Sequence, residues 1–168
     1  MARTKLVFPE GTVETIEATR SRGTILCAGT KAGYNGMTIG WITIGNAWGR
    51  PCCAVLVRPS RYTYKFMEEG STFTVSTLST ELQHAVDLFG DKSGRDMDKF
   101  KAAKVTAAKG LAVEAPYVKE ADLVIECKIA FKSPINPKLI MADYVKEMYE
   151  EGDYHTIYYG EIVCVHAK

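Results

Sequence analysis

One short segment of the chain combines cationic and hydroxyl side chains at the expected junction of a strand and a helix. It runs from Arg58 to Thr63 and reads Arg-Pro-Ser-Arg-Tyr-Thr. Free amide groups at the start of a helix carry a partial positive charge, and they bind anions. The two arginines would add charged hydrogen bonds, and the hydroxyls of Ser60 and Thr63 would add further donors. The segment therefore predicts a phosphate site; the alternative is an ordinary capped helix with two solvated arginines.

A second segment, Asn35 to Trp41, leads from a turn into a strand and reads Asn-Gly-Met-Thr-Ile-Gly-Trp. Its small and hydroxyl residues leave backbone amides and carbonyls open to a flat polar heterocycle. Met37, Ile39 and Trp41 alternate along the strand, so they share one side and could form an apolar wall. The alternative is a turn followed by a core strand, because tryptophan is more often a core residue than a ligand contact.

A third segment, Asp91 to Phe100, is dense in cations, anions and hydroxyls within ten positions. As a binding element it would clamp a phosphate and the edge of a ring, with Lys92, Arg95 and Lys99 as donors. The alternative is a solvated loop in which Asp96 caps a short helix. The residues alone leave both interpretations open.

The elements that must position these segments are mainly strands. Six segments are apolar, rich in β-branched residues or alternating, as strands are: Thr24 to Thr30, Met37 to Gly45, Cys52 to Val57, Thr72 to Leu78, Leu123 to Phe131 and Thr156 to Val165. Two interior glycines in the second suggest a bend. In the fifth, the apolar odd-numbered positions share one face, with Glu126 and Lys128 on the opposite face. The early strands follow one another through short turns, which favours antiparallel pairing and a small closed β-barrel.

Few helices are expected, and all are short. Ser60 is the predicted N-cap of a helix over residues 61–69 that stops at Gly70. A capping box at Thr80 to Gln83 predicts a second helix, which ends at Gly90. Asp143 is a candidate cap for a third helix over residues 144–150.

Composition restricts the class of protein. The 168 residues, 46% hydrophobic and 24% charged, predict one domain over residues 1–168 with a core of its own. A net charge of +1 lacks the excess of basic residues that is typical of nucleic-acid-binding proteins. No apolar run is long enough to span a membrane, and Met1 to Gly11 has no signal core, so a cytoplasmic location is expected. Five cysteines cannot all pair, and their spacing predicts no metal site.

Four motifs, in order and spacing, resemble the flavin reductase-like family with its FMN-binding split β-barrel, and especially the flavoredoxin branch. The resemblance covers nearly the whole chain. It rests on Asn35 to Trp41, Arg58 to Thr63, Ser93 to Phe100 and the ending His155 to Ile162. It implies FMN bound without a covalent bond, in a homodimer whose sites lie near the subunit interface.

The resemblance also implies a role for each matching residue. Asn35, Met37, Thr38 and Ile39 would lie along the isoalloxazine, largely through backbone groups, with Trp41 also among the cofactor-binding residues. Arg58, Ser60, Arg61 and Thr63 would hold the ribityl phosphate, and Lys92, Ser93, Gly94, Arg95 and Asp96 would reach the ring edge or the phosphate. His155 would lie on the side of the reducing nucleotide. The alternative for His155 is a core histidine at the start of a strand.

The expected function is that of an FMN-dependent flavin reductase or flavoredoxin-type oxidoreductase. It would pass electrons from NAD(P)H, or from a protein donor, through bound FMN. The chain has no Gly-x-Gly-x-x-Gly fingerprint, so NAD(P)H would have to stack directly over the flavin. Two alternatives remain: a non-enzymatic FMN electron carrier, and a flavin-free barrel that acts as a binding module.

Overall fold

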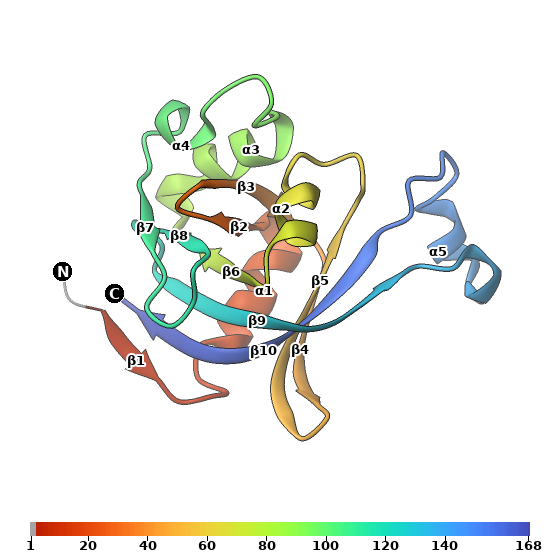
Figure 1. Cartoon of the computed structure of the whole chain (residues 1–168), viewed down its shortest axis with the longest axis horizontal. Helices are drawn as coiled ribbons and strands as arrows, with labels where there is room; N and C mark the ends of the chain where they lie inside the picture. Colours follow the sequence, from red (N-terminus) through yellow and green to blue (C-terminus); the bar gives the residue numbers. More distant parts are fainter. Residues whose placement is uncertain (1–2) are drawn as a thin grey trace.

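A computed structural model describes residues 3–168. Met1 and Ala2, which begin the segment predicted to have no signal core, lie outside the described residues. Most of the strands form one sheet (Figure 1). They are β1 (Thr4–Leu6), β2 (Thr24–Thr30), β3 (Gly33–Ile39), β4 (Ile42–Ala47), β5 (Arg50–Val57), β6 (Thr72–Thr77), β9 (Leu123–Pro134) and β10 (Thr156–Ala167). Two short strands, β7 (Ala107–Lys109) and β8 (Pro116–Val118), pair separately.

The order of strands in the sheet explains why it curls into a split barrel. The order is β3-β2-β6-β9-β10-β5-β4, with β1 beside β10, and every pairing is antiparallel. The two terminal strands of this order, β3 and β4, are consecutive in the chain and are joined through Gly40 and Trp41. The connection brings the two edges of the sheet together, although no ladder joins β3 to β4 within residues 3–168. The predicted mainly β, largely antiparallel split barrel is confirmed.

Five of the six predicted strands lie where the sequence pattern places them, within a few residues. The sixth, Met37 to Gly45, is wrong as a single strand because the chain bends at Gly40 and Trp41 and divides it into β3 and β4. The interior glycine thus marks the bend that separates the two edges of the barrel.

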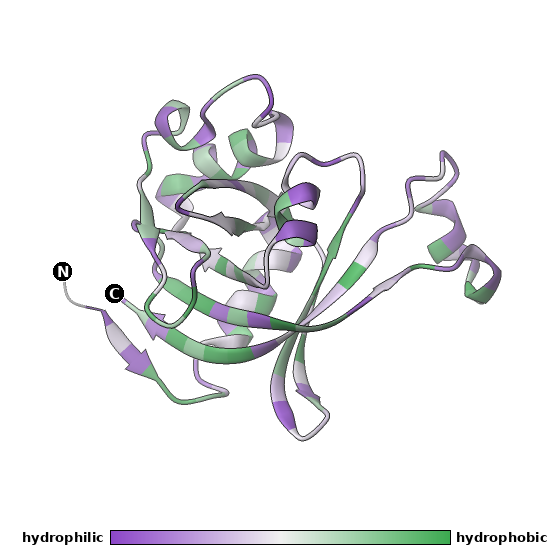
Figure 2. Cartoon of the chain, in the orientation of Figure 1, coloured by the Kyte–Doolittle hydropathy of each residue, from purple (hydrophilic) through white to green (hydrophobic). Residues whose placement is uncertain are grey.

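Side chains inside the barrel form one core cluster that includes Leu26, Val55, Phe73 and Ile125. A second cluster lies between the outer face of β2 and β9 and the segments that cover it, which include the helix after β6. Figure 2 shows the hydrophobic residues concentrated on these strands and on the helical segments beside them.

Glu126 lies on the face of β9 that the alternating pattern assigns to charged residues, and it is fully buried there. Its carboxylate accepts hydrogen bonds from the amides of Leu111 at 2.8 Å and Ala112 at 2.7 Å, and it lies 2.9 Å from Nε2 of His166. Burial raises the pKa of Glu126, but these hydrogen bonds outweigh burial and hold the pKa below its usual value. The carboxylate therefore fixes the loop that covers this part of the sheet.

The helices differ most from the sequence-based expectation. They are α1 (Thr12–Arg22), α2 (Thr63–Glu69), α3 (Gln83–Asp91), α4 (Lys99–Ala102) and α5 (Asp143–Glu147), with single 3-10 turns at Thr80–Leu82 and Pro137–Leu139. The sequence did not predict α1, because its threonines and other β-branched residues have low helix propensity. Tertiary contacts stabilise it: the hydroxyl of Thr15, for example, lies 3.2 Å from that of Thr77.

Three predicted helix starts are wrong. Ser60 does not cap α2: its hydroxyl donates to Oδ2 of Asp153 at 2.5 Å, and the helix begins only at Thr63. Thr80 opens a 3-10 turn without a side-chain cap, and α3 continues one residue past Gly90. Asp143 lies inside α5 and pairs with Lys146 at 2.9 Å.

The cap of α4 is Asp98, whose side chain accepts from the amide of Lys101, and not Asp96. Among residues 3–168, no helix combines the length and the apolar character that crossing a bilayer requires.

Candidate functional site

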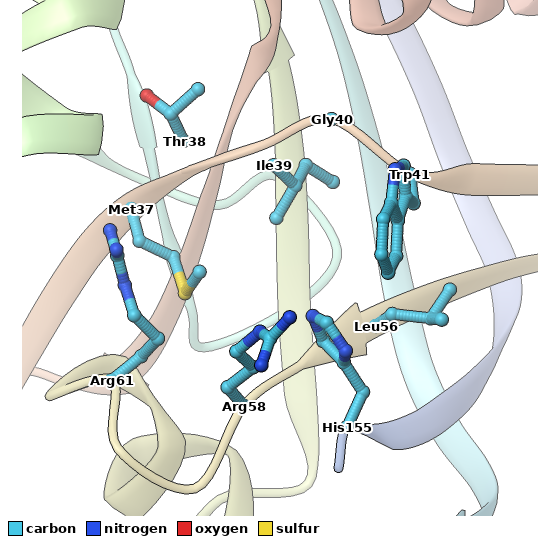
Figure 3. Close-up of a pocket in the computed structure, with 9 residues that line it drawn as sticks. All are labelled: Met37, Thr38, Ile39, Gly40, Trp41, Leu56, Arg58, Arg61 and His155. Atoms are coloured by element: carbon cyan, nitrogen blue, oxygen red, sulfur yellow. The ribbon is translucent and has the colours of Figure 1, made fainter. Parts of the chain in front are cut away.

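Two adjoining cavities bring the sequence motifs together, and they share Met37 and Arg61 as lining residues. We call the first the wall cavity; it has a volume of about 220 Å³. It is lined by Met37, Thr38, Ile39, Gly40, Trp41, Leu56, Arg58, Arg61 and His155 (Figure 3). These residues come from the end of β3, the bend after it, the end of β5, the turn between β5 and α2, and the position just before β10.

Trp41 and His155 form the aromatic side of the wall cavity. Their ring centroids lie 4.9 Å apart with the planes tilted by 47°, and Figure 3 shows both side chains beside Leu56. His155 is buried, and its Nδ1 lies 2.8 Å from the hydroxyl of Tyr149. Burial, reinforced by the nearby charge of Arg58, lowers the pKa of His155 to about 4. The imidazole is therefore neutral at pH 7.

Arg58 also lines the wall cavity, but the residues before β10 occupy most of its guanidinium. Its Nη2 donates to the carbonyl of Met148 at 2.9 Å, and its Nη1 donates to the carbonyl of Asp153 at 3.2 Å. The guanidinium carbon lies 5.2 Å from the ring centre of Tyr149. Together with the hydrogen bond from Ser60 to Asp153, these contacts tie the turn before α2 to the segment that carries His155.

We call the second cavity the anion cavity; it has a volume of about 190 Å³. It is lined by Asn35, Met37, Ser60, Arg61, Tyr62, Thr63, residues 90–95 and Lys99. Four of these residues are cationic and one, Asp91, is acidic. Within residues 3–168, none of the four cations lies within salt-bridge distance of a carboxylate.

Lys99 is the most deeply buried of these cations, with 3% of its surface exposed. Its Nζ donates to the carbonyl of Phe89 at 3.0 Å and lies 5.2 Å from the ring centre of Phe89. Burial, followed by the charge of Arg61, lowers the pKa of Lys99 to about 8. Buried charges are normally paired, so a buried ammonium beside an arginine indicates a site for an anion.

Asn35 and the loop at Gly94 close one side of the anion cavity. The side-chain amide of Asn35 donates through Nδ2 to the hydroxyl of Thr63 at 2.8 Å, which connects β3 to the first residue of α2. A side chain at position 94 would collide with the side-chain oxygen of Asn35, so only glycine allows the loop to pass this closely. Thr38, by contrast, donates its hydroxyl to the carbonyl of Val86, which connects β3 to α3.

The structure thus gathers nearly all of the predicted site residues around the two cavities, from segments that are far apart in the chain. Asp96 is the exception, since it lines neither cavity and lies in a neighbouring groove. The charged segment predicts Lys99 as one of three possible donors to a phosphate or a ring edge, but the family resemblance implies no role for it. Its position three residues beyond Asp96 in the same charged segment was the available signal. Leu56 and Tyr62, which also line the cavities, carried no signal of their own.

Comparison with known proteins agrees with this fold. The chain belongs to the flavin reductase like domain family, which matches residues 18–168. Flavoredoxin of Desulfovibrio vulgaris (Miyazaki F) is 28% identical with a TM-score of 0.69, and the match covers 87% of this chain and 69% of that chain. Flavoredoxin from Methanosarcina acetivorans is 25% identical with a TM-score of 0.69, covering 88% of this chain and 68% of that one.

Among curated relatives, an uncharacterized protein of Aeropyrum pernix is 27% identical over 118 residues, which is 70% of this chain and 38% of that protein. A second, from Pyrococcus abyssi, is 27% identical over 136 residues, 80% of this chain and 66% of that protein. The chain therefore spans between about two fifths and two thirds of the length of these relatives.

Proposed function

We propose that this protein binds FMN without a covalent bond and passes electrons through it, as an oxidoreductase of the flavin reductase or flavoredoxin type. The observation that carries the proposal is a pair of cations, the buried Lys99 and the half-buried Arg61, in a cavity that adjoins an aromatic and apolar wall. An anionic group at one end and a flat heterocycle at the other are the two features of a flavin mononucleotide. The resemblance to proteins called flavoredoxins supports the same assignment.

The donor set fits this cofactor. Arg61 and Lys99 would hold the phosphate, and the backbone from Met37 to Ile39 would lie along the ring system. When bound, FMN supplies the N5 position that accepts a hydride or two electrons. The protein would orient the ring, exclude water from the wall cavity through Trp41 and Leu56, and present a neutral His155 toward the electron donor, which is NAD(P)H or another protein.

Replacing Arg61 with alanine tests the phosphate contact. The loss should weaken FMN binding about tenfold, because a hydrogen bond to a charged group contributes about 1.5–3 kcal/mol. Riboflavin lacks the phosphate, so its affinity should change little. Titration of both ligands by fluorescence quenching makes the comparison, with Arg50→Ala as the control because Arg50 is exposed and pairs with Glu161 outside both cavities. Equal losses for FMN and riboflavin would contradict the phosphate assignment.

The same preparation distinguishes the alternatives. Absorbance spectra of the purified protein are recorded before and after addition of FMN, then NADH, then NADPH. A protein that remains colourless with FMN is a flavin-free binding module. If the protein binds FMN but neither NADH nor NADPH reduces the bound flavin, the protein is an electron carrier that receives its electrons from another protein.

We also propose that the protein is a homodimer. Trp48 is 68% exposed, although its ring centroid lies 5.8 Å from that of Phe131 and 5.7 Å from that of Tyr159, so the three rings form an aromatic surface. The segment between β9 and β10 exposes further large apolar side chains, including Met141 and Tyr144. Exposed apolar surface of this kind marks an interface, and two-fold dimers are the commonest oligomers. Light scattering at micromolar concentration should give about twice 18.6 kDa, and a mass of 18.6 kDa would contradict the dimer.

A further inference from the structure

The segment between α5 and β10 contains two consecutive residues in the left-handed backbone conformation. Gly152 has a φ of 78° and Asp153 a φ of 52°. Glycine adopts this conformation freely, and aspartate is one of the few other residues that do so. The turn directs both carbonyls at Arg58, whose Nη1 lies 3.4 Å from that of Gly152 and 3.2 Å from that of Asp153. The backbone of this turn therefore fixes Arg58, which lines the wall cavity.

The side chain of Asp153 binds Ser60, which lies 93 positions earlier in the chain. Its Oδ1 accepts a hydrogen bond from the amide of Ser60 at 3.3 Å, and its Oδ2 accepts one from the hydroxyl at 2.5 Å. The carbonyl of Ser60 accepts a hydrogen bond from Nη1 of Arg95 at 3.1 Å. The amide, hydroxyl and carbonyl of Ser60 thus all have partners. Ser60 lines the anion cavity, but its two donors hold the turn in place through Asp153.

Asp153 stands between residues of the two cavities. Arg61 follows Ser60 directly, and its amide donates to the carbonyl of Arg58 at 3.0 Å, which closes the turn before α2. His155 follows Asp153 by two residues, and Figure 3 shows its ring beside Arg58. A displacement of Asp153 would therefore move the turn that carries Arg61 and the segment that carries His155 together.

We propose that Asp153 is a positioning residue that couples the two cavities. Its carboxylate holds the turn from Arg58 to Arg61 against the segment that carries His155, so that the anion cavity and the wall cavity keep one relative geometry. The inference rests on the proposed function, because it takes the anion cavity as the phosphate site and His155 as facing the electron donor. Asp153 lines neither cavity, and it acts through Ser60 and His155.

Two variants remove the contact from opposite ends. Asp153→Gly removes the carboxylate and accepts the positive φ, and Ser60→Ala removes the hydroxyl donor. Each should weaken FMN binding about five- to tenfold in isothermal titration calorimetry, because the turn that carries Arg61 loses its support. The double variant should bind no more weakly than the weaker single variant, since both changes remove the same contact. Asp153→Asn retains an acceptor oxygen and should bind FMN within about threefold of wild type.

The histidines report on the wall cavity in the protein without flavin. The chain has three, His84, His155 and His166, whose ring signals are measured by nitrogen-15 NMR and assigned through His155→Ala. Ser60→Ala should shift the signals of His155, although Ser60 lines only the anion cavity of the two. The signals of His84 and His166 should remain in place, which shows that the fold is intact.

Asp143→Asn is the matched control, because Asp143 belongs to α5, pairs with Lys146 and lines neither cavity. It should change neither FMN affinity nor the signals of His155.

The outcomes separate this inference from the proposed function. If wild type binds FMN, but Ser60→Ala leaves the signals of His155 unchanged or Asp153→Gly leaves FMN affinity within twofold, Asp153 does not couple the cavities and the proposed function stands. Fully additive losses in the double variant would contradict the coupling in the same way. If wild type binds no FMN, both proposals fail.

Discussion

Replacing Lys99 with methionine should weaken FMN binding about 10- to 100-fold at pH 7, the range that corresponds to losing a charged hydrogen bond. Methionine has a similar length and fills the same buried space, but it has neither the charge nor the donors. Lys99 is almost completely buried, so water cannot substitute for the lost interaction. The dissociation constant is measured by fluorescence titration. Lys92→Met is the matched control because Lys92 lines the same cavity but is exposed, and its effect should be smaller.

The pH dependence of binding provides a second measure of the same contact. Burial and the charge of Arg61 lower the pKa of Lys99 to about 8 in the protein without ligand. An anion favours the protonated ammonium, so FMN affinity should be full below this pKa and should decline as the pH rises through it. Between pH 7 and pH 9 the dissociation constant should increase by up to about tenfold in wild type. Lys99→Met should show no such increase. A slope that persists in this variant would show that another group titrates.

His155→Ala is expected to slow reduction of bound FMN by NAD(P)H about 100-fold, the size of effect that a small misplacement of a reactant can produce. His155 lines the wall cavity beside Trp41 and does not line the anion cavity, where both Arg61 and Lys99 lie. FMN affinity and the flavin spectrum should therefore remain nearly unchanged. Stopped-flow measurement at saturating FMN gives the rate for the flavin-bound protein.

A purely structural role for His155 predicts another pattern. His155 is buried against Tyr149, so its loss could lower the melting temperature and leave the reduction rate of folded molecules intact. A thermal melt of the same sample separates the two roles. Tyr149→Phe is the matched control, since it removes the hydroxyl at Nδ1 of His155 and keeps both rings. A normal rate in His155→Ala would assign His155 to the core.

Local sequence patterns predict most of this fold, because the fold consists mainly of strands. Alternating or continuous apolar runs located most strands of the barrel, because period-two burial is visible in a sequence. Helix α1 was not predictable in this way, since its buried face is made of threonine and alanine and its stability comes from contacts such as Thr15 with Thr77. The burial of Glu126 depends on a loop and on His166, forty positions away, so no local pattern shows it.

The candidate site was predicted through its motifs, and the limits of that prediction have a physical reason. Motifs show which residue types occur together, but they do not show which side chains already form hydrogen bonds within the protein. Arg58 and Ser60 are bound by groups some ninety positions further along the chain. Lys99 is distinguished only by its burial, which depends on its packing against Phe89, ten positions earlier in the chain.

The two sheet edges, β3 and β4, lie together without a ladder between them, and this affects how the protein can recognise a ligand. An edge strand keeps one row of backbone amides and carbonyls without a partner strand. Within residues 3–168, β3 is such an edge strand, and its last residues line the wall cavity. In a fully closed barrel those groups would form hydrogen bonds to the next strand, and only side chains could bind a ligand. In this protein the main chain itself can present donors and acceptors to a flat heterocycle. Substitutions at residues 37–39 would then alter shape more than hydrogen bonding, and quite different sequences could retain the same ligand.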